Sequence, residues 1–210
     1  MNSSSMPVDS RIPFFDTLAR SWDKQQDLPV LAHALHDFFT TCNIQRDETI
    51  LDIGCGTGNL TDALLTWLSP SGRVTAIDIS PGMLSVARQK IQDSRVTWLQ
   101  TSAETVPVAD HSYDRLICFS AWPHFESPIA VANECYRILR PGGKAHLLHL
   151  ISRHQVNHIH SQVHPSVQND RLPPVQKVSE LFQSAGFTVL EACEDHQRYL
   201  LTARKEKNIL

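Results

Sequence analysis

The sequence predicts an α/β fold with a doubly wound, mostly parallel sheet that ends in an antiparallel hairpin. Three observations lead to this prediction. Short apolar runs alternate with amphipathic stretches, a glycine-rich turn follows the first run, and two apolar runs stand side by side near the end of the chain. Such alternation is typical of right-handed βαβ crossovers, which place helices on both faces of a parallel sheet.

The expected elements follow one another in a regular order. The strands before the hairpin are Thr49–Ile53, Arg73–Ile77, Arg95–Leu99, Asp114–Phe119 and Lys144–Ile151. The helical patterns are Leu60–Leu68, Met83–Ile91, Ile129–Leu139 and Pro174–Ala185, the last with proline near its start and glycine just past its end. The hairpin would pair Phe187–Glu194 with Arg198–Ala203 across a turn near Asp195.

Length and composition limit the possible functions. The 210 residues suffice for one α/β domain with a buried core. A net charge of −3 gives no sign of a nucleic-acid or membrane surface, and no apolar run is long enough to span a bilayer. The first residues lack a signal-peptide pattern, and the five scattered cysteines contain no CxxC pair. We therefore expect a cytoplasmic protein with a small-molecule partner, whose oligomeric state the composition does not indicate.

One domain over residues 1–210 is expected, with three special segments. Residues 1–10 are interpreted as a disordered tail, 11–48 as a helical cap and 152–173 as a lid. Six of the eleven histidines fall between positions 146 and 164. Long loops are usually functional or disordered, and this one follows the carboxyl end of a strand, where open α/β sheets bind ligands.

The glycine-rich turn predicts a cofactor site. Gly54, Gly56 and Gly58 alternate between the first strand and the first crossover helix, where glycine permits positive φ and close approach of a ligand. The helix presents free N–H groups to a polar ligand. Asp78 ends the second strand, where a carboxylate can accept hydrogen bonds from ribose hydroxyls. These features also fit a nicotinamide dinucleotide, and a tight turn without a ligand is the structural alternative.

Five segments together resemble the class I S-adenosylmethionine-dependent methyltransferases, specifically the small type 11-like members. They are Leu51–Gly58, Ala76–Leu84, Ala103–Pro107, Tyr113–Cys118 and Tyr136–Lys144. The resemblance extends over nearly the whole chain, and the last segment has no counterpart in the dinucleotide-binding fingerprint. It implies S-adenosylmethionine as cofactor and a Rossmann-like methyltransferase fold with seven strands.

The resemblance also implies roles for individual residues. The loop would hold the methionine part of the cofactor, the second strand end would bind its ribose, and further residues would contact adenine or line the methionine pocket. The implied cofactor residues are Asp52, Gly54, Cys55, Gly56, Gly58, Asp78, Ile79, Met83, Ser102, Ala103 and Phe119. Ser102 stands where many relatives carry Asp, so we expect adenine selectivity to depend more on backbone contacts. Phe14–Asp23 resembles the N-terminal helix of these enzymes, whose aromatic residues either line the pocket or pack on the sheet.

Histidines are the candidate acceptor-site residues. His124 follows the fourth strand between aromatic residues, and His149 lies near the end of the fifth. Strand alternation points His146 to the opposite face from His149. His124, His149 and His160 could act as base, bind the acceptor or together hold a metal ion, although no metal is required. A structural role is the alternative for His124.

The stretch Arg153–His164 is interpreted as a helix. Val156, Ile159 and Val163 would form its inward stripe, with His160, Arg153, Asn157 and His164 along one edge of that stripe and His154 and His158 toward solvent. Arg171 would bind an acceptor carboxylate or pair with Asp170.

The leading hypothesis is methyl transfer from S-adenosylmethionine to a small molecule by in-line displacement. A dinucleotide-dependent oxidoreductase and a non-catalytic cofactor- or metal-binding protein are the alternatives.

Overall fold

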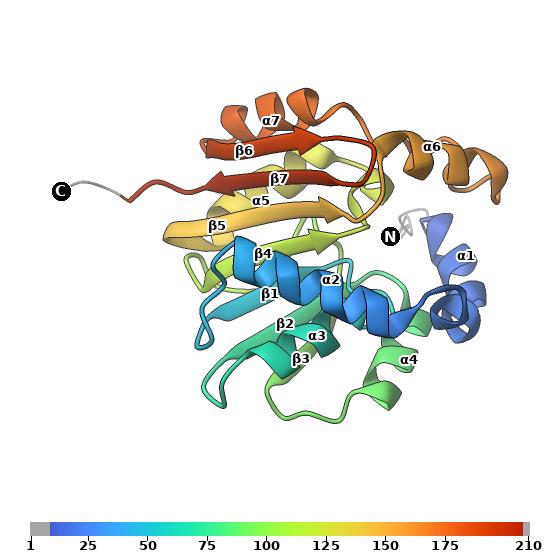
Figure 1. Cartoon of the computed structure of the whole chain (residues 1–210), viewed down its shortest axis with the longest axis horizontal. Helices are drawn as coiled ribbons and strands as arrows, with labels where there is room; N and C mark the ends of the chain where they lie inside the picture. Colours follow the sequence, from blue (N-terminus) through green and yellow to red (C-terminus); the bar gives the residue numbers. More distant parts are fainter. Residues whose placement is uncertain (1–8, 208–210) are drawn as a thin grey trace, which may run out of the picture.

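The computed structural model describes residues 9–207, and a seven-stranded sheet forms its centre (Figure 1). The strand order is β3-β2-β1-β4-β5-β7-β6, and β7 alone runs antiparallel to its neighbours. The predicted fold class is therefore confirmed. The strands are β1 (Thr49–Ile53), β2 (Arg73–Asp78), β3 (Val96–Gln100), β4 (Tyr113–Phe119), β5 (Leu139–His149), β6 (Thr188–Glu194) and β7 (Tyr199–Arg204).

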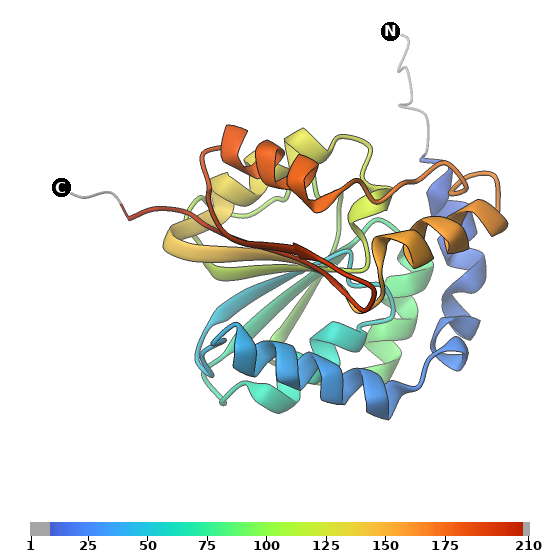
Figure 2. The same ribbon diagram turned by 45° about the horizontal axis from the view of Figure 1, so that its top comes forward.

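Helices cover both faces of the sheet (Figure 2). One layer contains α2 (Leu28–Thr41), α3 (Asn59–Trp67) and α4 (Pro81–Lys90), and the other contains α5 (Pro128–Ile138) and α7 (Val175–Ser184). Successive residues of β1 serve opposite layers: Ile50 packs in the cluster beside α2 and α3, and Leu51 in the cluster beside α5 and α7. Within residues 9–207, no helix has both the length and the apolar character that a membrane crossing requires.

One expected boundary was wrong: β5 begins at Leu139 instead of Lys144. Leu139 pairs with Tyr113 and Lys144 with Arg115, so β5 advances five positions while β4 advances two. The segment Pro141–Gly143 is an irregular part of the strand. Gly142 has φ +88° there, a conformation that favours glycine. The other predicted strand and helix ends lie within two residues of the observed ones.

A third group of helices lies across the carboxyl ends of the parallel strands. It consists of α1 (Arg11–Leu18), the 3₁₀ helix η1 (Ala19–Gln25) and α6 (Arg153–Gln162) (Figure 2). The ring of Phe14 in α1 stacks on His164 just after α6, with 5.4 Å between centroids. Residues 1–8 of the predicted tail lie outside the described residues, whereas Asp9 accepts hydrogen bonds from Arg11 and Ser10 precedes α1.

Candidate active site

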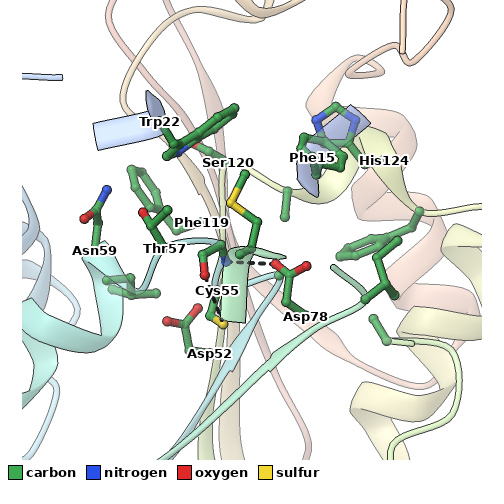
Figure 3. A pocket seen from close by; sticks show the side chains of 18 of the residues that line it. Phe15, Trp22, Asp52, Cys55, Thr57, Asn59, Asp78, Phe119, Ser120 and His124 are labelled. Atoms are coloured by element: carbon green, nitrogen blue, oxygen red, sulfur yellow. Dashed lines mark hydrogen bonds between the residues drawn. The ribbon is translucent and has the colours of Figure 1, made fainter. Parts of the chain in front are cut away.

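A cavity of 760 Å³ lies at the carboxyl ends of the parallel strands, beneath α1, η1 and α6. Its size is in the ordinary range for small-molecule sites. Asp52, Cys55 and Asp78 form its floor, Phe15 and His124 lie together on one side, and Trp22 covers the other (Figure 3). The predicted residues that line it are Asp52, Gly54, Cys55, Gly56, Asp78, Ile79, Met83, Ser102, Ala103, Phe119, His124, His149 and His160.

The three glycines of the turn have positive φ but different surroundings. The N–H groups of Gly54 and Cys55 both donate to the carbonyl of Ile77 at 2.9 Å, which ties the turn to the end of β2. A Cβ atom on Gly54 would lie 2.4 Å from that of Ala121, whereas one on Gly56 would meet nothing within 4 Å. Gly56 therefore leaves open space at the cavity wall, which fits a cofactor resting on the backbone.

Gly58 does not contact the cavity, unlike the other predicted loop residues. It precedes the first residue of α3 with φ +81°, and a Cβ atom there would crowd Ala87, Ile91 and Trp98 at 3.0–3.3 Å. Gly58 therefore starts the helix and allows close packing, and its predicted contact with a cofactor stays a prediction.

Asp78 organises the loop from below. Its Oδ2 accepts from the N–H of Gly56 and its Oδ1 from that of Ser80, both at 2.8 Å. Burial raises the pKa of Asp78, while the backbone donors oppose the rise. A carboxylate has about four lone-pair positions, so capacity remains for two ribose hydroxyls.

Asp52 lies deeper, 1% exposed, and accepts from the hydroxyl of Thr61 at 2.6 Å. Burial raises the pKa of Asp52 to about 7, and the charge of Asp78 adds to the rise. The resemblance implied backbone or water donors to Asp52 beneath the loop, whereas the donor seen is the side chain of Thr61.

The sequence did not point to Glu104. The hydroxyl of Ser102 donates to its carboxylate, which also lines the cavity. A carboxylate thus stands beside Ser102, the position where many relatives carry Asp. The cavity therefore has a charged acceptor at the predicted adenine edge.

Two further carboxylates connect the cap to the helices below it. Asp23 of η1 accepts from Thr57 at 2.6 Å, Asn59 at 3.0 Å and Lys90 at 2.9 Å. Asp16 of α1 accepts from the N–H of Gly82 at 2.8 Å, in the first turn of α4. Both carboxylates therefore lie at helix N-termini, where negative charge is favoured.

The opposite side of the cavity contains two adjacent imidazoles. His124 ends the short 3₁₀ helix η2 (Trp122–His124) that follows β4, and His160 comes from α6. Their ring centroids are 4.7 Å apart, and the ring of Phe15 meets His124 edge-on at 5.1 Å. Asp170 contacts both: its Oδ2 lies 2.7 Å from Nδ1 of His124, and its carbonyl oxygen lies 2.7 Å from Nδ1 of His160.

His149 lines the same cavity but is separate from this pair. Its Nε2 is buried and has no hydrogen-bond partner among the described residues. Burial lowers the pKa of His149 to about 3, and the charges of His124 and His160 add to the shift. As expected, His146 faces the other side of the sheet, where it contacts Arg115 at 2.9 Å.

A metal site built from the three histidines is not formed. Within the described part of the chain, no three His, Cys, Asp or Glu side chains are placed to hold an ion. His124 and His160 direct their Nδ1 atoms to Asp170, and Nε2 of His149 has no hydrogen-bond partner among the described residues. The residues present therefore do not fit a metal at this position.

Helix α6 agrees only partly with its expected faces. Val156 is buried, but Ile159 and Val163 are 49% and 39% exposed, because the helix covers the cavity mouth instead of a continuous core. Asn157 binds the backbone of Leu172 as an inward-edge residue would, and His154 and His158 are exposed as predicted. Arg171 donates to the carbonyl of Asn157 and forms no ion pair with Asp170 among the described residues; its expected contact with an acceptor carboxylate stays a prediction.

Comparisons with known proteins agree with this geometry. A family model described as a methyltransferase domain matches residues 51–147. The ubiquinone/menaquinone biosynthesis C-methyltransferase UbiE of Hahella chejuensis is 31% identical over 137 residues, 62% of this chain and 55% of that protein. The malonyl-[acyl-carrier protein] O-methyltransferase of Priestia megaterium is 32% identical over 130 residues, 61% of this chain and 47% of that protein. The chain thus spans about half the length of these curated relatives.

Among solved structures, phosphoethanolamine N-methyltransferase 2 of Haemonchus contortus, in complex with S-adenosyl-L-methionine, superimposes with a TM-score of 0.75. The likeness covers 96% of this chain and 61% of that chain at 17% identity. At this identity the comparison shows a common fold.

Proposed function

We propose that this chain, which belongs to the class I S-adenosylmethionine-dependent methyltransferases, transfers a methyl group from S-adenosylmethionine to a small-molecule acceptor. The observation that carries the proposal is the open space above Gly56, next to the half-buried carboxylate of Asp78. A ligand of the cofactor's shape would place its polar chain on the loop and its ribose at Asp78.

The cavity that contains the glycine turn, Asp78 and Ser102 also contains His124, His160 and Phe15. These side chains support an acceptor site beside the cofactor. We further propose that residues 11–48 and 152–173 act as cap and lid of the same domain. Relatives are named for quinone carbon and malonyl oxygen methylation, so the acceptor atom does not follow from them.

Calorimetry on the full chain tests the cofactor. S-adenosylmethionine and S-adenosylhomocysteine should both bind with dissociation constants in the micromolar range, and NAD should not bind at tenfold higher concentration. Binding of NAD in preference to S-adenosylmethionine would favour the oxidoreductase alternative and contradict the proposal. Release of S-adenosylhomocysteine in the presence of an acceptor separates an enzyme from a binding protein.

A further inference from the structure

We propose that His124, positioned by Asp170, is the general base for methylation of a neutral, largely apolar acceptor that carries a phenol-like or enol-like hydroxyl. The inference rests on the proposed methyl transfer and adds the chemical class of the acceptor and the group that removes its proton. Asp170 is a positioning residue, because it acts through the imidazole.

Asp170 determines which nitrogen of each imidazole is free. A carbonyl oxygen can only accept, so Nδ1 of His160 carries the proton in its contact with Asp170. An ionised carboxylate likewise requires Nδ1 of His124 to be the donor. Nε2 of each neutral ring is then a proton acceptor. Both residues line the cavity. The contacts of Asp170 thus leave one nitrogen of each imidazole able to accept a proton.

The two imidazoles differ in what would follow protonation. His124 faces a carboxylate that would stabilise an imidazolium, whereas His160 faces only a carbonyl dipole. Burial lowers the pKa of His160, and its contact with Asp170 only partly offsets this. His124 is therefore the better base, and His160 remains a neutral partner that can accept a hydrogen bond from the bound acceptor.

Several carboxylates surround His124. Asp9 and Asp78 lie within electrostatic range of His124 in addition to Asp170, while His149 and His160 are neutral or weakly basic neighbours. Arg11 lies near Asp170 but is already paired with Asp9 at 2.8 Å. A developing imidazolium thus meets more negative than positive charge.

The cavity lining selects against charged acceptors. Among its described lining residues there is no lysine or arginine, and several carboxylates are present. An acceptor carboxylate or phosphate would have no cation to compensate for its lost hydration. Phe15 meets His124 edge-on, and Phe15, Phe125 and Val156 supply apolar surface to the cavity wall. A phenol and an alkylammonium lose protons at similar pH, about 10, but only the phenol enters such a wall uncharged.

The proposed step balances. Bound S-adenosylmethionine would supply an electrophilic methyl group. A lone pair of the acceptor oxygen forms the new carbon–oxygen bond. The carbon–sulfur bond breaks at the same time and leaves its electron pair on sulfur. The hydroxyl proton moves to Nε2 of His124. The positive charge of the sulfonium is thereby replaced by that of the His124 imidazolium beside Asp170. After product release, His124 returns the proton to solvent.

The test uses three probes of one size, 2-naphthol, 2-naphthoate and 2-naphthylmethylamine, with the full chain. In the presence of S-adenosylhomocysteine, we expect 2-naphthol to bind at least tenfold more tightly than either charged probe at pH 7.5. With S-adenosylmethionine, we expect 2-methoxynaphthalene and one equivalent of S-adenosylhomocysteine to form. Failure of 2-naphthol to bind, or tighter binding of a charged probe, overturns the acceptor class.

Variants test the base. His124→Ala should lower kcat for 2-naphthol by about 10²- to 10⁴-fold, with partial rescue by added imidazole. Asp170→Asn keeps a hydrogen-bond acceptor but removes the negative charge that faces an imidazolium at His124. It should lower kcat by a smaller factor and move the acid limb of the pH profile to lower pH. Asp37→Asn is the matched control, because its exposed contact with His33 at 3.7 Å is the same kind of pair outside the cavity.

Binding of S-adenosylmethionine separates the two levels of the proposal. If the variants bind it as the wild type does, they are folded, and any loss of kcat belongs to the base. If the wild type does not bind it, the proposed function itself fails. If bound 2-naphthol is not methylated, or Asp170→Asn leaves the pH profile unchanged, His124 is not the base that we propose.

Discussion

Two glycines in the turn between β1 and α3 have different roles: Gly54 allows close packing and Gly56 leaves open space at the cavity. Gly54 and Gly56 both have positive φ, +70° and +52°, but only Gly54 is in close contact with a neighbour, Ala121. An alanine at either position bears the cost of the left-handed conformation, about 1–2 kcal/mol. The difference between the two substitutions therefore measures the effect of the new methyl group on its surroundings, separately from the backbone cost.

We expect Gly56→Ala to lose about 1–2 kcal/mol of unfolding free energy but to weaken S-adenosylmethionine binding at least tenfold. Gly54→Ala should lose more stability, because its Cβ atom would also overlap Ala121. Urea unfolding and calorimetry measure the two effects. Equal cofactor affinity in Gly56→Ala and wild type would contradict the proposed position of the cofactor on this loop.

Sequence reasoning succeeded for residues within short motifs and failed for residues that act across long separations. The turn and Asp78 could be recognised because their spacing repeats the geometry of one βαβ unit. Asp170 is 46 positions from His124, and Asp23 is 34 from Thr57. No periodicity relates such positions, since the path of the intervening chain determines which carboxylate reaches which donor. For Gly58, the motif does not distinguish a packing glycine from a ligand-contacting one, and the structure shows the packing.

At the scale of elements, α1 and η1, the first part of the proposed cap, are held to the sheet domain mainly through polar contacts. Within the described residues, α1 contributes no buried side chain and η1 only Ala19. Asp23 joins η1 to α3 and α4 through three donors. Few buried apolar contacts are typical of segments that open locally. Residues 11–25, which form α1 and η1, should therefore open more easily than the rest of the fold.

Asp23→Ala should increase opening of the cap by an amount that corresponds to about 1–3 kcal/mol, because its donors would lose a charged acceptor. Hydrogen exchange should become faster in residues 11–25 while β1 and β4 stay protected, and S-adenosylmethionine should bind more weakly. Asp37→Asn on the exposed surface of α2 serves as control. Unchanged exchange in the cap would show that Asp23 does not hold it.

The elements themselves were largely predictable, because apolar periodicity reflects burial on one or two faces. The exceptions were elements whose environment is not uniform. The start of β5 depends on how its three extra residues are accommodated against β4. The exposure of Ile159 follows from the position of α6 over the cavity mouth. Both follow from tertiary contacts that local sequence does not contain.

For the whole molecule, burial of His149 and His146 makes stability depend on pH. Burial lowers the pKa of His149 to about 3 and lowers that of His146. The unfolded chain binds protons at these sites near pH 6.5, whereas the folded chain does not. Each therefore contributes stability that is present above pH 6.5 and is lost as pH falls below it.

His149→Phe should reduce the slope of unfolding free energy against pH between pH 4 and 6 by about 1.4 kcal/mol per pH unit. Urea unfolding at several pH values in that range measures the slope in variant and wild type. His154→Phe, at an exposed position of α6, should leave the slope unchanged. An unaltered slope in His149→Phe would mean that His149 becomes protonated within the fold.

The place of β7 in the sheet also has a consequence for synthesis. β7 follows β6 in sequence but lies between β5 and β6 in space. While the chain emerges from the ribosome, the outer edge of β5 therefore has no partner until Tyr199–Arg204 has left the exit tunnel. An unpaired apolar edge is a template for association with other chains. The nascent protein thus needs protection longest at the strand that carries His149.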